Sequence, residues 1–198
     1  MKNIIALVAV LTPGLVLAQP AGIRALYEAG KHEEVVEAVG NNAAAEPSDV
    51  YLAAQSSQKI SNNDAANELY TRLAGRDDAD PWRHIGESAL AISRNNAVAA
   101  VTSARRAEEL GGDLSYAHYQ LGMAYVNQQD FQAASTAFER ASELDPGMAY
   151  AHYNAGLMYY RVKRIDKMAS HFEMFLKLAP EAPERGQVES IMRTVRGR

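Results

Sequence analysis

Three histidines recur at a constant spacing, and histidine can bind a metal or titrate near neutral pH. His84, His118 and His152 lie 34 residues apart. If this spacing reflects stacked repeats, consecutive histidines lie about 10 Å apart, whereas two nitrogens on one zinc each lie about 2 Å from it. The spacing therefore favours a packing role. A pH-sensitive ladder and a metal site remain the alternatives.

Other patterns that carry chemistry in enzymes are missing from the sequence. It contains no G-x-S-x-G nucleophile turn, H-E-x-x-H zinc pair or phosphate-binding loop. The absence of cysteine excludes disulfides, thiolate zinc sites and a cysteine nucleophile. Asp77, Asp78 and Asp80 lack the spacing of a calcium loop and are typical of an acidic turn that caps a helix. We expect no enzymatic activity, no cofactor and no metal.

The composition is that of an ordinary soluble domain. The 198 residues are 47% hydrophobic and 22% charged, and the formal net charge is -4. A dedicated nucleic-acid-binding domain is normally basic, so we expect no nucleic-acid partner. Ala, Glu, Leu and Arg recur, whereas the strand-favouring Val, Ile and Thr are sparse. The sequence therefore predicts a helical fold.

The N-terminal segment has the pattern of an export signal. An apolar stretch extends from Ile4 to Leu17, and Val16 and Ala18 suit the -3 and -1 positions of a cleavage site. A membrane-spanning helix needs about 20 residues, so stable membrane insertion is the weaker alternative. We predict a signal peptide over residues 1–18, cleavage near Ala18–Gln19, and a periplasmic or secreted location in a bacterial envelope.

Aligned columns arise when the sequence is shifted along itself by 34 residues. Each unit contains two apolar helical patterns separated by a short polar turn, which predicts a helical hairpin. The polar turns are Ser61–Asn63, Asn95–Asn96, Asn127–Asp130 and Lys163–Arg164. The columns include Tyr51, Ile85, Tyr119 and Tyr153; Ser48, Trp82, Tyr116 and Tyr150; and Ala66, Ala100, Ala134 and Met168.

These units resemble the tetratricopeptide repeat (TPR) family. The best unit, residues 115–148, carries the family's pattern at Leu121, Gly122, Tyr125, Ala134, Phe138, Ala141 and Pro146. The following unit, residues 149–182, keeps Gly156, Tyr159, Phe172 and Pro180. It has the larger Met168 and Phe175 where small residues are usual. The resemblance implies an all-α fold, an α-solenoid of antiparallel helical hairpins that forms a right-handed superhelix with a concave groove.

The repeats predict the organisation of the whole chain. A degenerate first hairpin at 19–46, turning at Gly30–Lys31, precedes four repeats at 47–80, 81–114, 115–148 and 149–182. A capping helix and basic tail follow at 183–198. Val188, Ile191, Met192 and Val195 give this segment one apolar stripe, because they fall at i, i+3, i+4 and i+7. The helix would cover the last hairpin.

The resemblance also implies that the first helix of each repeat lines the groove. Tyrosine suits recognition because it offers a rigid apolar ring and a hydroxyl. The alternative is that these side chains pack against neighbouring helices. The predicted binding residues are Tyr51, Trp82, Tyr116, Tyr119, Met123, Asn127, Tyr150, Tyr153, Leu157, Tyr160 and Arg161.

Three functions are compatible with this surface. The leading hypothesis is an exported TPR adaptor or scaffold, monomeric or weakly self-associating, that binds a protein segment in the Tyr-rich groove during envelope assembly or maintenance. A binder of a glycan or small envelope ligand is the first alternative, since Asn127 and Asn154 accompany the aromatic residues. A self-assembling structural subunit is the second. A basic turn around Arg161 and Lys163 suggests a solvated face or an acidic partner.

Overall fold

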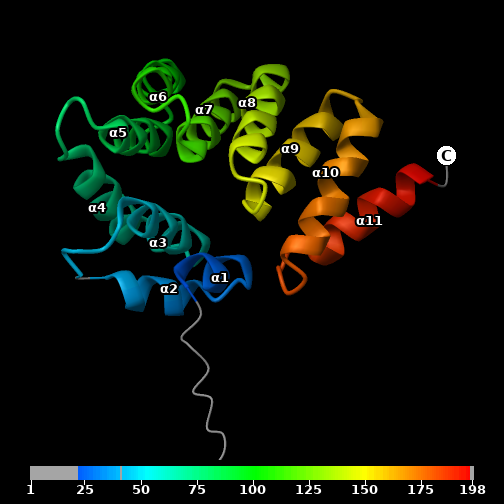
Figure 1. Ribbon diagram of the computed structural model, residues 1–198, viewed down its shortest axis with the longest axis horizontal. Coiled ribbons are helices and arrows are strands. Elements are labelled where there is room, and N and C mark those ends of the chain that lie inside the picture. The colour runs from blue at the N-terminus through cyan, green and yellow to red at the C-terminus, as the bar shows by residue number, and fades with distance from the viewer. Residues whose placement is uncertain (1–21, 41, 197–198) are drawn as a thin grey trace, which may run out of the picture.

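A computed structural model describes residues 22–40 and 42–196 of the chain. In these residues the chain forms eleven helices and no strand, which follow one another along a curved solenoid (Figure 1). The predicted α-solenoid is confirmed. None of the helices in these two ranges is long and apolar enough to cross a membrane. The predicted export signal lies outside the described residues, as do the side chains of Arg196 and Arg198.

Consecutive helices pair as hairpins. The first pair is α1 (Ile23–Glu28) and α2 (His32–Val39), on either side of Gly30. The next pairs are α3 (Pro47–Lys59) with α4 (Asn63–Ala74), α5 (Pro81–Ser93) with α6 (Ala97–Leu110), α7 (Ser115–Gln128) with α8 (Phe131–Leu144), and α9 (Ala149–Arg161) with α10 (Ile165–Leu178). The last helix, α11 (Arg185–Arg196), follows α10. The boundaries of the repeats themselves stay a prediction.

The turn inside each of the last four hairpins has a left-handed residue that is not glycine. The φ angles of these residues lie between 54° and 65°. They are Ser61, Asn95, Gln129 and Lys163. In three turns the next residue, Asn62, Asn96 or Asp130, caps the second helix by accepting a hydrogen bond from a backbone N–H. The fourth turn has Arg164 there, and arginine cannot accept one.

Glycines bring the helices of one hairpin close together. A Cβ atom on Gly122 of α7 would lie 2.7 Å from the ring of Phe138 on α8. Gly156 and Phe172 repeat this contact between α9 and α10, at 2.5 Å. Both phenylalanine side chains are fully buried. The missing Cβ therefore lets a large ring fill the space between two helices.

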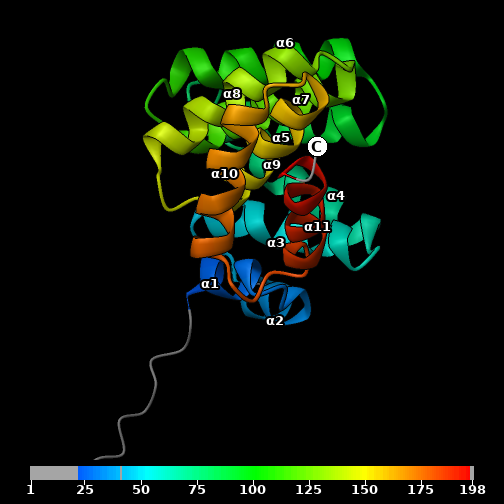
Figure 2. The same ribbon diagram turned by 90° about the vertical axis from the view of Figure 1, so that its right-hand side faces the viewer.

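The solenoid curves until its N-terminal hairpin lies beside the loop between α10 and α11 (Figures 1 and 2). The Lys59 ammonium at the end of α3 lies 2.7 Å from a carboxylate oxygen of Glu184, 125 residues further along the chain. Beside this ion pair, Gly30 has a φ of 73° and packs so closely on Pro183 that a Cβ would lie 2.6 Å from its ring. The N-terminal hairpin therefore closes the concave side of the curve.

Candidate binding groove

Five of the predicted binding residues meet on the concave side. We call Tyr51, Trp82, Tyr116, Tyr119 and Tyr150 the aromatic floor. The Tyr51 ring centroid lies 5.6 Å from that of Tyr116 and 6.4 Å from that of Tyr119. The four tyrosines are between 1% and 6% exposed, and Trp82 is half-buried. Helices α3, α5 and α7 thus bring four of these rings into one aromatic cluster, and Tyr150 of α9 lines the same cavity as its tyrosines.

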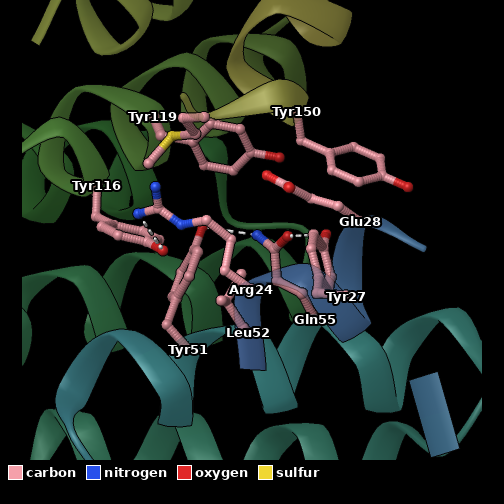
Figure 3. Close-up of a pocket in the computed structure, with 10 residues that line it drawn as sticks. Arg24, Tyr27, Glu28, Tyr51, Leu52, Gln55, Tyr116, Tyr119 and Tyr150 are labelled. Carbon is pink, nitrogen blue, oxygen red and sulfur yellow. Dashed lines mark hydrogen bonds between the residues drawn. The ribbon is translucent and has the colours of Figure 1, made fainter. Parts of the chain in front are cut away.

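A chain of hydrogen bonds fixes this floor. The Tyr27 hydroxyl donates to Gln55 Oε1 at 2.7 Å, and Gln55 Nε2 donates to the Tyr51 hydroxyl at 2.7 Å (Figure 3). The Tyr51 hydroxyl donates to Gln120 Oε1 at 2.7 Å, and Gln120 Nε2 donates to Ser88. Burial raises the pKa of Tyr27 and of Tyr51, so both hydroxyls stay protonated donors at neutral pH. A satisfied buried network of this kind holds its side chains in one arrangement.

Helix α1 covers the floor. Its Arg24 side chain reaches over the Tyr116 ring, and its Tyr27 ring lies 5.0 Å from the ring of Tyr150 (Figure 3). The cavity left between α1 and the floor measures about 20 Å³, which is room for about one water molecule. A ligand therefore reaches Tyr51 and Tyr116 only if α1 moves.

An open hollow remains beside α1, and we call it the side groove. Its volume is about 210 Å³. Gln58 and Lys59 are exposed in it, and Met123, Tyr153 and Asn154 are half-buried. The complete lining is Tyr27, Gln55, Gln58, Lys59, Tyr119, Met123, Tyr150, Tyr153 and Asn154. The side groove therefore presents apolar, aromatic and amide groups together.

A carboxylate balances the one cationic side chain that lines the side groove. Glu184 accepts hydrogen bonds from Lys59 Nζ and from the Tyr150 hydroxyl, both at 2.7 Å. Burial acts to raise the pKa of the Glu184 carboxyl, but these two hydrogen bonds outweigh it and lower that pKa. The carboxylate is therefore ionised at neutral pH, and the side groove offers little net charge to a ligand.

The other four predicted binding residues lie away from the floor. Asn127 donates to Asn95 Oδ1 at 3.3 Å, while its own Oδ1 is buried without a hydrogen-bond partner among the described residues. Leu157 is half-buried against the core. Tyr160, 42% exposed, and Arg161 lie beside a hollow at the C-terminal end of the solenoid. Contact with a partner stays a prediction for all eleven residues.

The histidine column has a repeated local role. In each of these histidines Nε2 bonds a backbone carbonyl six residues earlier, in the loop that enters the helix. The distances are 2.9 Å for His84, 2.9 Å for His118 and 3.3 Å for His152. No group of three or more His, Cys, Asp or Glu residues in the described ranges could hold a metal ion. These bonds tie each first helix to the loop before it.

No sequence pattern indicates the residues that close the groove. Arg24 and Tyr27 come from the hairpin that is out of register with the 34-residue spacing, and Asp145 and Glu184 lie in inter-helix loops. Their partners lie far away along the chain. A repeat pattern indicates which residues occupy equivalent positions, and it does not indicate which ends of the solenoid touch.

Comparison with known proteins supports the fold. A family model described as tetratricopeptide repeat matches residues 119–183. A comparison with curated proteins gave no match. The thermophilic TPR protein TTC0263 of Thermus thermophilus is 16% identical, with a TM-score of 0.58 over 83% of this chain and 89% of that chain.

Two further solved structures are similar. YrrB, described as a TPR protein with an unusual peptide-binding site, is 20% identical, with a TM-score of 0.53 over 85% of this chain and 88% of that chain. MamA is 20% identical, with a TM-score of 0.50 over 74% of this chain and 84% of that chain. The chain therefore has the α-solenoid fold of TPR proteins, and its residues 119–183 match the tetratricopeptide repeat family.

Proposed function

We propose that this protein is a non-catalytic scaffold that binds a segment of another protein in the side groove. The observation that carries the proposal is the open hollow between α3, α7 and α9, which remains although α1 covers the floor. We propose further that the protein acts after export, in assembly or maintenance of a bacterial envelope, on the basis of the signal pattern in residues 1–18.

The size of the side groove favours a peptide over a glycan or other small ligand. Sites that enclose a small molecule measure about 300–1,000 Å³. The side groove holds about 210 Å³, which suits one or two side chains of an extended segment. Met123 and Tyr153 would contact an apolar side chain. Gln58 Oε1 accepts from Tyr70 and Asn154 Nδ2 donates to Tyr119, so Gln58 Nε2 and Asn154 Oδ1 are the groups that would bond the backbone of the segment. YrrB, of similar fold, is described as having a peptide-binding site.

The balanced charge of the side groove predicts how binding responds to salt. Lys59 is paired with Glu184, so the segment gains little from long-range attraction. Binding should therefore depend on shape and aromatic contact, and it should change little between low and physiological salt.

The test is a crosslinking pull-down from envelope extracts with the full chain. The Met123→Ala, Tyr153→Ala double variant removes the apolar side chains of the side groove, and it should lose the partner that the parent recovers. Loss of an aromatic contact of about 2 kcal/mol weakens affinity by about 30-fold. Val98→Ala is the matched control because Val98 is 73% exposed on α6. Equal recovery by the double variant, with circular dichroism unchanged, would exclude the side groove.

A further inference from the structure

We propose that the aromatic floor is itself a binding site for a helical segment with Arg, Tyr and Glu at positions i, i+3 and i+4. Helix α1 is the copy of this ligand that the chain holds on its own floor, through Arg24, Tyr27 and Glu28. The inference goes beyond the proposed function: it concerns the covered floor and not the open side groove, and it names a different class of partner, a helix that displaces α1.

Arg24 has an acceptor and a ring as partners. Its Nη1 lies 2.7 Å from Asp145 Oδ2, in the loop between α8 and α9. Its Nη2 donates to the Tyr116 hydroxyl at 3.4 Å, and the guanidinium carbon lies 5.9 Å from the centre of that ring. Arginine is suited to this site because its planar guanidinium can bond a carboxylate and lie over an aromatic face. A lysine in its place would lose that combination.

Tyr27 has partners for both its ring and its hydroxyl. The side chain is 3% exposed, and the ring makes a tilted contact with Tyr150, at 5.0 Å between centroids. The hydroxyl donates to Gln55 at 2.7 Å and so joins the hydrogen-bond chain of the floor. A phenylalanine at this position would fill the same space and leave the Gln55 oxygen without this donor. The floor therefore selects tyrosine.

Glu28 lies against the start of a long helix. Its Oε1 accepts from the backbone N–H of Ala149, the first residue of α9, at 3.4 Å. An acceptor oxygen suits this place because the first N–H groups of a helix have no partner within it, although burial raises the pKa of the Glu28 carboxyl. The three side chains thus reach three different places on the concave side: an inter-helix carboxylate, a ring and amide, and a helix N-terminus.

Helix α1 is a weak occupant of this site. It has six residues, and its N-cap, Gly22, makes no side-chain capping bond. Helices much shorter than about 12 residues are not stable by themselves in water. Gly30, with φ at 73°, joins it to α2. A longer helix with the same three side chains would keep its own hydrogen bonds and replace α1 without changing the floor.

Because α1 is part of the chain, a free helix has to compete with it for the floor. A tethered ligand competes at an effective concentration of about millimolar, so a free segment binds the parent chain poorly. Weakening α1 should therefore raise the affinity for the same segment supplied from solution. This increase separates a floor that recognises α1 from a floor that is only packed core.

The experiment uses a fluorescent peptide of residues 22–31 and the full chain. Fluorescence anisotropy compares the parent with the Arg24→Ala, Tyr27→Ala variant, and we expect the variant to bind about tenfold tighter or more. The control peptide carries the same two substitutions and should bind neither chain. Equal affinity for both chains, or binding to neither, would overturn the proposal. The single Trp, Trp82, lies 5.2 Å from Tyr116, so its emission should change when the peptide binds.

A second pair of variants covers the case in which the double variant does not fold. Asp145→Arg reverses the charge that holds Arg24, and the Arg24 side chain itself is 40% exposed. A peptide with Arg24→Glu should bind this chain more tightly than the unchanged peptide does. If it binds no better, the recognition of Arg24 by Asp145 is wrong and the proposal is overturned.

The two proposals fail separately. Binding of the peptide to the α1-weakened chain supports the floor, even if the Met123→Ala, Tyr153→Ala pull-down shows no dependence on the side groove. In the opposite case, a partner that depends on Met123 and Tyr153 supports the side groove, while a peptide that fails to bind overturns the floor as a helix site.

Discussion

The histidine column and the aromatic floor follow the same 34-residue spacing, yet they obtain their hydrogen bonds in different ways. Each histidine bonds a carbonyl six residues earlier, in the loop before its helix. Tyr51 of the floor donates to Gln120, 69 residues away, and beside the floor Lys59 pairs with Glu184, 125 residues away. The histidine contacts recur because they are local. The floor contacts exist once, because they depend on how many hairpins the solenoid contains and where its curve closes.

Loss of a local packing ring should have the largest effect on stability. Phe138→Ala removes a fully buried ring from its contact with Gly122, and we expect it to lower the free energy of unfolding by about 3–5 kcal/mol. Phe172→Ala, in the same position of the next hairpin, should cost a similar amount. Urea unfolding measures both. A loss below about 1 kcal/mol in either variant would mean that the two hairpins do not pack as equivalents.

Loss of a floor hydroxyl should cost less. Tyr51→Phe keeps the ring and removes the group that accepts from Gln55 and donates to Gln120. Leaving buried polar partners unsatisfied costs about 1–3 kcal/mol. Tyr160→Phe is the control, since Tyr160 is 42% exposed and should change stability by less than about 0.5 kcal/mol. Equal effects in the two variants would show that the floor network is not formed in solution.

Loss of the histidine hydrogen bond to a loop carbonyl should lower the free energy of unfolding by a smaller amount still. His118→Phe removes the donor to the Gly112 carbonyl, together with the 3.3 Å contact between its Nδ1 and Glu108, and a net hydrogen bond is worth about 0.5–1.5 kcal/mol. Chemical denaturation of His84→Phe and His118→Phe should give similar values, because both histidines bond the carbonyl six residues earlier. A large difference between the two losses in free energy of unfolding would show that His84 and His118 do not have equivalent roles.

The third histidine adds a pH dependence. His152 Nδ1 lies 3.1 Å from Nδ1 of His171, which faces Glu139 at 3.8 Å. Burial, with the neighbouring histidine, lowers the pKa of His152, and burial lowers the pKa of His171 despite Glu139. The unfolded chain therefore takes up protons first as pH falls below 6.5, and stability present above that pH is lost.

Thermal unfolding between pH 7.5 and 5.5 measures this effect. The melting temperature should fall across that range in the parent and fall less in His171→Gln. A parent whose stability rises as pH is lowered would show that the two rings take up protons in the folded state.

Loss of the ion pair between Lys59 of α3 and Glu184 of the loop before α11 should have the smallest effect on stability. Lys59 is 42% exposed in its side chain and Glu184 is 13% exposed. A double-mutant cycle with Lys59→Met and Glu184→Gln should give a coupling of about 0.2–1 kcal/mol. The coupling should shrink as salt is added, because an exposed charge is screened. A coupling of zero at low salt would place these two residues apart in solution.

The sequence predicts the features that repeat. The 34-residue columns indicate the hairpins, and Asn62, Asn96 and Asp130 follow the residues that make the left-handed turns. The columns also indicate that Tyr51 and Tyr119 occupy equivalent positions in their repeats. The 34-residue period and the Asn and Asp residues of the turns are sufficient to predict these features, because neighbouring hairpins contact each other through equivalent positions.

The closing contacts could not be predicted from the same pattern. Arg24 and Asp145 belong to no column, and their pairing depends on the accumulated curvature of the intervening helices. Tyr160 and Arg161 occupy predicted groove positions, yet they are exposed at the C-terminal end and lie away from α1. Equivalent positions in a repeat therefore differ in burial according to what lies opposite them.

The most direct test of groove closure is hydrogen exchange in α1. Backbone N–H groups of Ala29 and Lys31 make hydrogen bonds, and α1 should exchange slowly while it lies on the floor. Tyr150→Ala removes the floor ring that contacts Tyr27 of α1. Mass spectrometry should show faster exchange in residues 23–31 of this variant, with unchanged exchange in α6 as the control. Unchanged exchange in residues 23–31 would contradict the account that the contact with Tyr150 holds α1 on the floor.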